Sequence, residues 1–172
     1  MNDLNHMSGT DLSHVSGTDT DRVNGPGEEP PAGIDELLER VRRDYVRVGP
    51  REAYDVARAG DGLLVDIRYA ALRERDGLIP GAVVVERNEL EWRLDPRGSH
   101  RLPEATGHDL RVVVICNEGY ASSLAAVSLH QLGLRRATDL IGGFQAWRAD
   151  GLPVAAPSAP SAPSVPAGAR EA

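Results

Sequence analysis

The chain has 172 residues, 41% of them hydrophobic, which is enough for one domain with a sizeable core. Its formal net charge of −7 argues against non-specific binding to nucleic acid or to an anionic membrane surface. The single cysteine excludes an internal disulfide, a CxxC redox pair and a cysteine-based zinc site, so we expect neither a metal nor a cofactor. A monomer is the default expectation for the oligomeric state.

The two ends of the chain differ in composition from its middle. Residues 1–33 are rich in Asn, Asp, Ser, Thr, Gly and His, and residues 156–172 consist mostly of Pro, Ala and Ser. Such segments bury too little apolar surface to fold, so we expect both to be disordered. No apolar run approaches the ~20 residues of a membrane helix, and the first residues lack the charged and apolar segments of a signal peptide. The expected location is the cytoplasm.

Between these ends, the sequence pattern predicts alternating helices and strands. An amphipathic helix is expected over residues 34–44, because Ile34, Leu37 and Leu38 recur at helical spacing. The domain proper is expected over residues 45–155. Its first elements are expected, in chain order, as a brief strand at 45–48, a helix at 51–59, a strand at 63–68, a helix at 70–76, a strand at 83–85 and a helix at 86–94.

The second half of the domain is organised around one strand. Four consecutive branched apolar residues, Val112–Ile115, predict a strand buried on both faces, as in a parallel sheet. Cys116 follows directly, then a short glycine-containing loop, then Ser122 and Ser123, which can cap a helix. Strands alternating with helices predict an α/β fold, with a mostly parallel sheet covered by helices on both faces. The remaining elements are expected as a strand at 137–141 and a helix at 144–149.

The position of Cys116 favours a reactive thiol. Unpaired N–H groups at a helix amino terminus stabilise an anion, so a thiol beside them has a lowered pKa and reacts as a thiolate. The loop amides are then able to hold an anionic group attached to the sulfur or attacking it. The competing interpretation is that Cys116 is a small buried hydrophobe that extends the apolar strand.

Asp66 is the other polar residue that an apolar strand places in the interior. An acid there is costly to bury unless it is paired. We therefore predict that Asp66 accepts hydrogen bonds from the neighbouring backbone or from an arginine, in a structural role.

Three segments together resemble the rhodanese (sulfurtransferase) domain family. Residues 64–68 (LVDIR) followed by 77–82 (GLIPGA) are similar to its first signature, and residues 116–123 (CNEGYASS) to its active-site loop. Residues 140–147 (LIGGFQAW) with 151–154 (GLPV) resemble its closing signature. The resemblance covers residues 48–154 and implies a small five-stranded parallel sheet with helices on both faces.

The same resemblance implies a function for the loop. In this family the loop cysteine takes a sulfane sulfur from a donor such as thiosulfate, becomes a persulfide, and passes the sulfur to a thiophilic acceptor. Cys116 occupies the matching catalytic position, and the sulfur donor and acceptor are the implied partners. The implied substrate-binding residues of the loop are Asn117, Glu118, Gly119, Tyr120, Ala121 and Ser122.

The loop departs from the family pattern in its charge. Many family loops carry an arginine just before the serine, where this chain has Ala121, and the only charged residue of the loop is Glu118. A carboxylate beside the thiol raises the thiol pKa and repels an anionic donor. Arg68 and Arg87, and also Arg73, come from neighbouring strand ends and are candidates to bind the donor, or else are solvated surface arginines. We therefore expect sulfurtransferase activity that is low with thiosulfate.

Two alternative functions belong to the same fold. Phosphatases with a C-x5-R loop clamp phosphate with the arginine, but the corresponding residue here is Ser122, which disfavours phosphoryl transfer and arsenate reduction. A regulatory or partner-binding module, weak or inactive as a catalyst, fits the acidic loop, the small size and the two flexible tails. Such a module has no chemical need for Cys116.

Overall fold

The computed structural model describes residues 33–157. The segments expected to be disordered, 1–33 and 156–172, lie outside this range except for Gly33, Ala156 and Pro157. Every helix in the described range is too short or too polar to cross a lipid bilayer.

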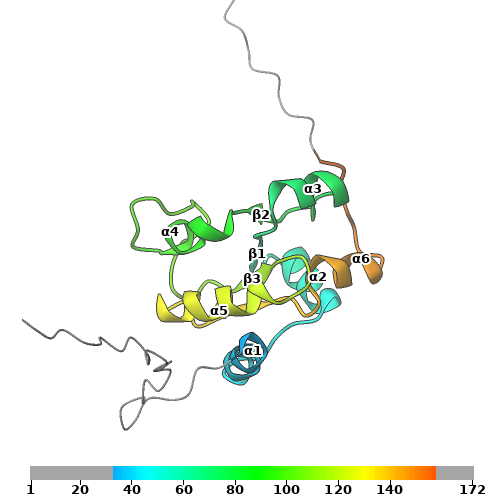
Figure 1. Ribbon diagram of the computed structural model, residues 1–172. Coiled ribbons are helices and arrows are strands. Elements are labelled where there is room, and N and C mark those ends of the chain that lie inside the picture. Colours follow the sequence, from blue (N-terminus) through cyan, green and yellow to red (C-terminus); the bar gives the residue numbers. More distant parts are fainter. Residues whose placement is uncertain (1–32, 158–172) are drawn as a thin grey trace, which may run out of the picture. The chain divides into compact units, whose positions relative to one another are not determined.

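Helices and strands alternate through most of the described chain (Figure 1). The helix expected at 86–94 is divided into a short 3-10 helix and an α-helix. Apart from the strand expected at 45–48, the other elements lie where they were expected, with ends that differ by a few residues. The helices are α1 (Ile34–Arg42), α2 (Pro50–Ala59), α3 (Ala70–Asp76), η1 (Arg87–Glu89, 3-10), α4 (Leu90–Leu94), α5 (Ala121–Gln131) and α6 (Gly143–Ala149). The strands are β1 (Leu63–Asp66), β2 (Val83–Val84), β3 (Val112–Ile115) and β4 (Ala137–Asp139).

The four strands form one parallel sheet in the order β2-β1-β3-β4. All four residues of β3 are buried, which confirms the interpretation of this apolar run and the α/β fold class. The fifth strand, expected at 45–48, makes only a single parallel bridge between Val48 and Leu140. Gly49 and Pro50 begin α2 immediately afterwards, so the chain leaves the sheet edge before a longer ladder forms.

Helices cover both faces of the sheet. Alternate side chains of a strand point to opposite faces. Val112 and Val114 pack beneath α4 and α5, whereas Val113 and Ile115 pack beneath α2 and α6. Cys116 belongs to the first of these two cores, so the strand directs its side chain towards the face covered by α5.

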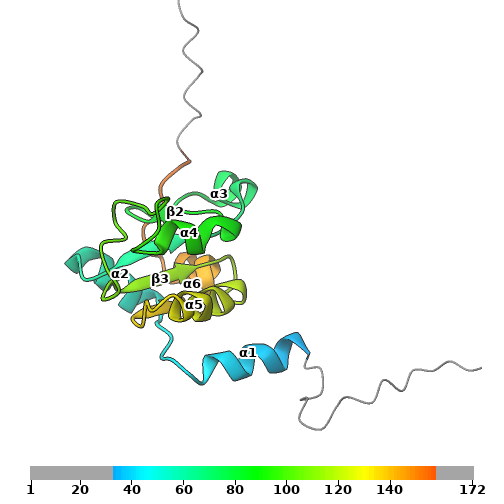
Figure 2. The same ribbon diagram turned by 90° about the vertical axis from the view of Figure 1, so that its left-hand side faces the viewer.

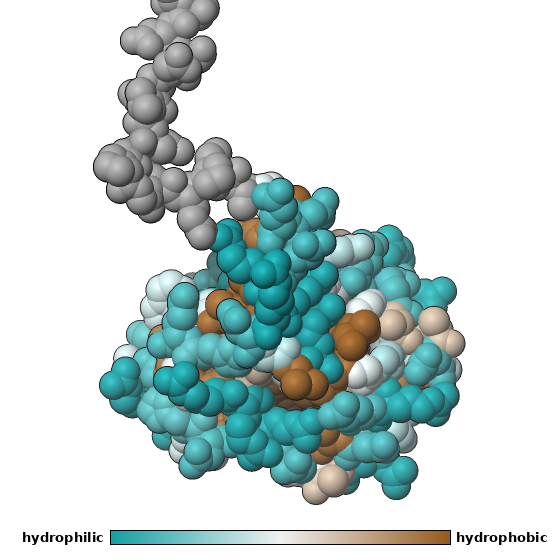
Figure 3. Space-filling view, turned by 90° about the horizontal axis from the view of Figure 1, so that it is seen from below, coloured by the Kyte–Doolittle hydropathy of each residue, from teal (hydrophilic) through white to brown (hydrophobic). Residues whose placement is uncertain are grey.

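Helix α1 lies outside these layers and packs against α5 (Figures 1 and 2). Leu38 is its buried residue, and most of its other side chains are charged. The surface seen from the side of α1 is mostly hydrophilic, with apolar side chains in separate small groups (Figure 3). The helix ends at Arg42, which reaches back to the loop after β3.

Candidate active site

The loop after β3 wraps around the sulfur of Cys116, a residue that is only 7% exposed. The backbone N–H of Gly119 donates a hydrogen bond to Cys116 Sγ at 3.1 Å. Helix α5 begins at Ala121, directly before the two serines. Within the described residues, no group accepts a hydrogen bond from the backbone N–H of Tyr120, Ala121 or Ser122. These amides are therefore available to an anion at the start of the helix.

The start of α6 supports the loop from another side through backbone contacts. The N–H of Phe144 donates to the carbonyl of Cys116 at 2.9 Å, and the N–H of Gln145 donates to the carbonyl of Asn117 at 3.1 Å. Gly143 has a φ of +58°, and a Cβ atom on it would lie 2.7 Å from the nitrogen of Gly119. Because no side chain fits there, glycine at position 143 lets the two backbones approach each other directly.

Ser122 and Ser123 do not cap α5, contrary to expectation. Their hydroxyl groups donate instead to Oδ2 of Asp139, at 2.9 Å and 3.0 Å respectively. The side chain of Asp139 is fully buried, so its charge needs nearby donors, and the two hydroxyls are within reach. Cys116 Sγ also contacts the Ser122 hydroxyl at 3.2 Å. A chain of hydrogen bonds thus connects the thiol to a buried carboxylate.

Asp139 is the centre of a network behind the loop that was not predicted from the sequence. Arg47 donates to it from Nε at 2.8 Å and from Nη2 at 2.9 Å, and the hydroxyl of Tyr45 donates at 2.8 Å. Burial, together with the charge of Asp139, raises the pKa of Tyr45 above its usual range. Burial opposes the charge of Arg47, but the hydrogen bonds and charge of Asp139 outweigh it and raise the pKa of Arg47. The sequence did offer a signal, because Asp139 lies in an expected strand, and an acid in a strand needs a partner, as Asp66 does.

Arg68 lines the pocket beside Cys116, but its guanidinium is bound by the protein itself. Its Nη2 binds Asp66 at 2.7 Å and the carbonyl of Gly77 at 2.8 Å, while its guanidinium stacks 3.6 Å from the ring centroid of Phe144. Both charged side chains of the pair are shielded from solvent. Arg68 pairs with Asp66 because the two residues lie only two positions apart in the chain. Asp66 therefore has the arginine and backbone donors that the sequence analysis suggested.

A pocket of about 200 Å³ borders the sulfur. Arg87 is the cation that lines it with a partly exposed side chain, and this arginine already pairs with Glu91 at 2.9 Å. Arg73 binds Glu86 instead and is not part of the lining. The exposed Glu118 lines this pocket. Gly119 and Ser122 contact the sulfur but are not part of the pocket lining. The lining residues are Ile67, Arg68, Tyr69, Leu72, Arg87, Cys116, Asn117, Glu118, Tyr120 and Ala121.

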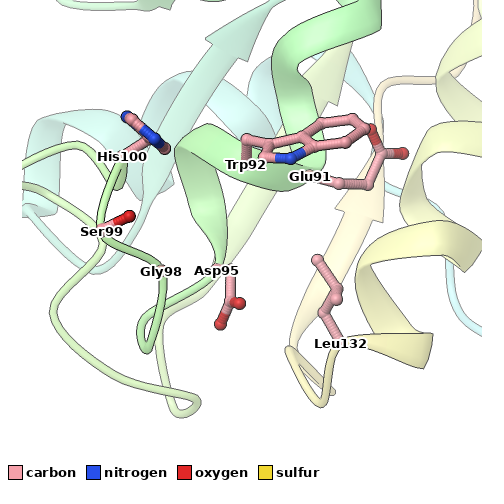
Figure 4. A pocket seen from close by; sticks show the side chains of 7 residues that line it. All are labelled: Glu91, Trp92, Asp95, Gly98, Ser99, His100 and Leu132. Carbon is pink, nitrogen blue, oxygen red and sulfur yellow. The ribbon is translucent and has the colours of Figure 1, made fainter.

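A second hollow of about 290 Å³ lies beside α4 (Figure 4). Leu132, in the turn after α5, lies across from Trp92 and Glu91 of α4, and residues 98–100 complete the wall. Cys116 does not line this hollow. Within the described residues, no three His, Cys, Asp or Glu side chains gather as metal ligands. The pocket at Cys116 is therefore the candidate active site.

Comparisons with known proteins identify the family of the domain. The model of the rhodanese-like domain matches residues 49–150. A sulfurtransferase from Allochromatium vinosum is 38% identical over 97 residues, which cover 56% of this chain and 81% of that protein. A thiosulfate sulfurtransferase, GlpE, from Actinobacillus succinogenes is 26% identical over 110 residues, which cover 64% of this chain and 90% of that protein.

A solved structure from Rhodopseudomonas palustris resembles the chain in fold and sequence. It is described as a protein of unknown function and possible tyrosine phosphatase. It superposes with a TM-score of 0.65 at 32% sequence identity, covering 76% of this chain and 99% of that one. The family model itself begins at residue 49, after Arg42, Tyr45 and Arg47, which contact the loop and Asp139.

Proposed function

Because the chain belongs to the rhodanese-like domain family, we propose that it transfers sulfane sulfur through a persulfide on Cys116. The observation that carries this proposal is the recessed sulfur, bound by the N–H of Gly119 at 3.1 Å beside amides that have no acceptor within the described residues. Donors arranged in this way stabilise both a thiolate and the terminal sulfur of a persulfide. The sulfurtransferases among the relatives support the same reaction class.

The reaction consists of two nucleophilic displacements. The Cys116 thiolate attacks the outer sulfur of the donor, so a new sulfur–sulfur bond forms while the bond to the rest of the donor breaks. The leaving group departs with the electron pair, as sulfite when the donor is thiosulfate. A nucleophilic acceptor then attacks the terminal sulfur of the persulfide, and the Cys116 thiolate leaves with its electron pair. No external oxidant or reductant is needed.

The hydroxyl of Ser122 can form a hydrogen bond with the sulfur both as a thiol and as a thiolate. Its hydroxyl has one proton, which is directed to Asp139 while Cys116 is a thiol. When the thiol loses its proton, rotation of the hydroxyl brings this donor to the thiolate. Asp139 keeps its hydrogen bonds from Ser123, Arg47 and Tyr45 meanwhile. The site thus changes charge without leaving the buried carboxylate unpaired.

The pocket favours an organic sulfur donor over thiosulfate. Its single unburied cation, Arg87, is already paired with Glu91, and the exposed carboxylate of Glu118 repels anions at the same pocket. Much of the remaining lining consists of Ile67, Leu72 and the two tyrosines Tyr69 and Tyr120. We therefore propose that organic persulfides or aromatic thiosulfonates react faster than thiosulfate, which carries two negative charges and little apolar surface.

Phosphoryl transfer is not proposed for this site. A phosphatase of this loop type needs an arginine to clamp the phosphate, and Ser122 stands in its place. The hydroxyl of Ser122 is bound to Asp139, and two arginines nearby, Arg42 and Arg47, donate to the carbonyl of Gly119 rather than lining the pocket.

Intact-mass spectrometry tests the proposed function. After exposure to a sulfur donor, the wild-type chain should gain about 32 Da, the mass of one sulfur on the nucleophile. Cyanide should remove this mass and release thiocyanate. Cys116→Ala, the matched control, should gain nothing. A folded wild-type chain that gains no sulfur from thiosulfate, an organic persulfide or a thiosulfonate would contradict the proposal and favour a regulatory or partner-binding module.

A further inference from the structure

Two arginines from outside the family-matched segment hold the loop from behind. Arg42, the last residue of α1, donates from Nη2 to the carbonyl of Gly119 at 2.8 Å and from Nε to the hydroxyl of Ser123 at 3.0 Å. Arg47 donates from Nη2 to the same carbonyl at 3.0 Å. The guanidinium of Arg42 also lies 5.8 Å from the ring centroid of Tyr120. One carbonyl of the sulfur-binding loop thus receives two charged donors.

This carbonyl belongs to the one glycine of the loop, whose backbone can rotate more freely than that of other residues. Gly119 has a φ of +81°, and its own N–H is the group that binds Cys116 Sγ. The peptide bond is trans, so the N–H of Tyr120 points opposite to the carbonyl of Gly119. Holding that carbonyl at the rear therefore turns the N–H of Tyr120 to the other side of the loop. It also limits rotation of Gly119 about the bonds that orient its own N–H.

We propose that Arg42 and Arg47 are positioning residues for Cys116, which fix the Gly119 peptide and place positive charge behind a loop that carries none of its own. They touch neither the reacting sulfur nor the pocket and act through the backbone. Because α1 supplies one of them, the amino-terminal helix is part of the sulfur-transfer apparatus. The role of these arginines in turnover rests on the proposed function, whereas their effect on the thiol can be tested without it.

Both positive and negative groups surround the thiol, and the two arginines add positive charge that favours the thiolate. Arg47 interacts favourably with the Cys116 thiolate, in addition to its stronger bonds with Asp139. Within the described residues no carboxylate pairs with Arg42, so its full charge acts on the loop. The charged and titratable groups that surround the sulfur are Arg42, Tyr45 and Arg47 behind the loop, Asp139 through Ser122, Glu118 and Tyr120 on the loop, Tyr69 and Arg87 in the pocket, and the Asp66–Arg68 pair at the end of β1.

The test is the pKa of the Cys116 thiol, measured in the full chain from the pH dependence of alkylation by iodoacetamide. Arg42→Gln should raise this pKa by about half a unit, which lowers the thiolate fraction about threefold below the pKa. Arg43→Gln, one residue further along and exposed, is the matched control and should leave the pKa unchanged. The rate of persulfide formation should shift to higher pH by the same amount and reach wild-type values at high pH.

Arg42→Gln leaves the Arg47–Asp139 pair intact, so the variant keeps the buried ion pair. A thiol pKa equal to that of Arg43→Gln would overturn the inference. A rate lowered equally at every pH would also overturn it, because that pattern indicates general loosening of the fold. Arg42→Lys keeps the charge but cannot bind Gly119 and Ser123 together, so it should restore the pKa only in part. If the wild-type chain forms no persulfide, the proposed function fails, while the alkylation result still decides this inference.

Discussion

The two sides of the loop at residues 116–123 differ in whether their charged groups are buried or exposed. Behind the loop, Arg47 and Asp139 form a buried ion pair, with side chains 16% and 0% exposed, and every charged group there has a hydrogen-bond partner. On the pocket side, the exposed Glu118 and the partly exposed Arg87 stand among mostly apolar side chains. The strong charges of this site therefore act from the protein interior, through the backbone, and not on the substrate directly.

This difference predicts unequal effects of the two sides. Water and salt screen an exposed carboxylate such as that of Glu118, whereas buried charges such as those of Asp139 and Arg47 are screened much less. Changes behind the loop should thus affect folding and the thiol strongly. Changes in the pocket should affect the choice of donor and little else.

The largest effect is expected from Asp139→Asn. Asp139 accepts hydrogen bonds from Arg47, Tyr45, Ser122 and Ser123. Removing one partner of a buried ion pair leaves a charge uncompensated, so the free energy of unfolding should fall by about 3–5 kcal/mol. Urea denaturation measures this loss. Asp150→Asn, which affects an exposed pair with Arg51, is the control and should cost about 1 kcal/mol or less.

An equal loss in these two variants would contradict the comparison, because it would mean that the rear network contributes no more than a surface ion pair.

Gly143→Ala is expected to have the next largest effect. The new Cβ would lie 2.7 Å from the nitrogen of Gly119, so the sulfur-binding loop must shift. Displacing reacting groups by about 1 Å lowers a catalysed rate on the order of 100-fold. Gly151→Ala has a similar positive φ, +68°, but open space around the new atom, and so isolates the backbone strain. Turnover with an organic donor should fall only in the first variant, and similar activities would show that the contact with α6 does not set the loop geometry.

On the pocket side, Glu118→Gln should raise the rate with thiosulfate several-fold and lower the pKa of Cys116. Two unit charges roughly 6 Å apart at an effective dielectric of about 20 repel by about 3 kcal/mol. Solvent screening reduces this value, and even a third of it, about 1 kcal/mol, changes the rate about fivefold. A neutral donor should gain much less, and the exposed Glu104→Gln should change neither rate. Unchanged thiosulfate turnover in Glu118→Gln would mean that this carboxylate does not affect the donor.

The smallest effect concerns alkaline pH and Tyr45. Its pKa is raised in the folded protein, so the folded state holds the phenol proton more tightly than the unfolded state. The stability from this difference is complete below about pH 10, the usual pKa of tyrosine, and is lost as the pH rises from there towards the folded-state pKa. In Tyr45→Phe the free energy of unfolding should fall less steeply above about pH 10. The exposed Tyr69→Phe should keep the wild-type slope, and a wild-type slope in Tyr45→Phe would contradict the burial of this phenol.

The sheet, the helices and the loop around Cys116 could be predicted from the sequence because they depend on local patterns. The apolar run Val112–Ile115 and the small, glycine-containing loop after Cys116 are readable without knowledge of any distant residue. The network behind the loop was not predicted, since Arg42 and Gly119 lie 77 residues apart and Arg47 and Asp139 lie 92 apart. Contacts over such distances depend on how α1 and β4 pack, which periodicity does not reveal.

Arg68 shows how a nearby partner constrains such a candidate residue. Its place just beyond β1 suggested a residue that reaches the substrate, but a carboxylate two positions earlier is a nearer and permanent partner. A charged side chain next to a strand end pairs first with the buried acid of that strand, because an unpaired acid in the interior is costly. The same reasoning applied to Asp139 would have led to a search for its arginine.

The recessed position of Cys116 also has a consequence for oxidation. The chain has one cysteine, so a sulfenic acid formed on it has no second thiol in the same molecule to resolve it. Two copies of the chain would have to bring their sulfurs to about 2 Å to form an intermolecular disulfide. Cys116 is only 7% exposed, so the walls of the pocket keep two such sulfurs apart. Reduction of a sulfenic acid on Cys116 would therefore require a thiol slender enough to enter the pocket, such as a small-molecule thiol.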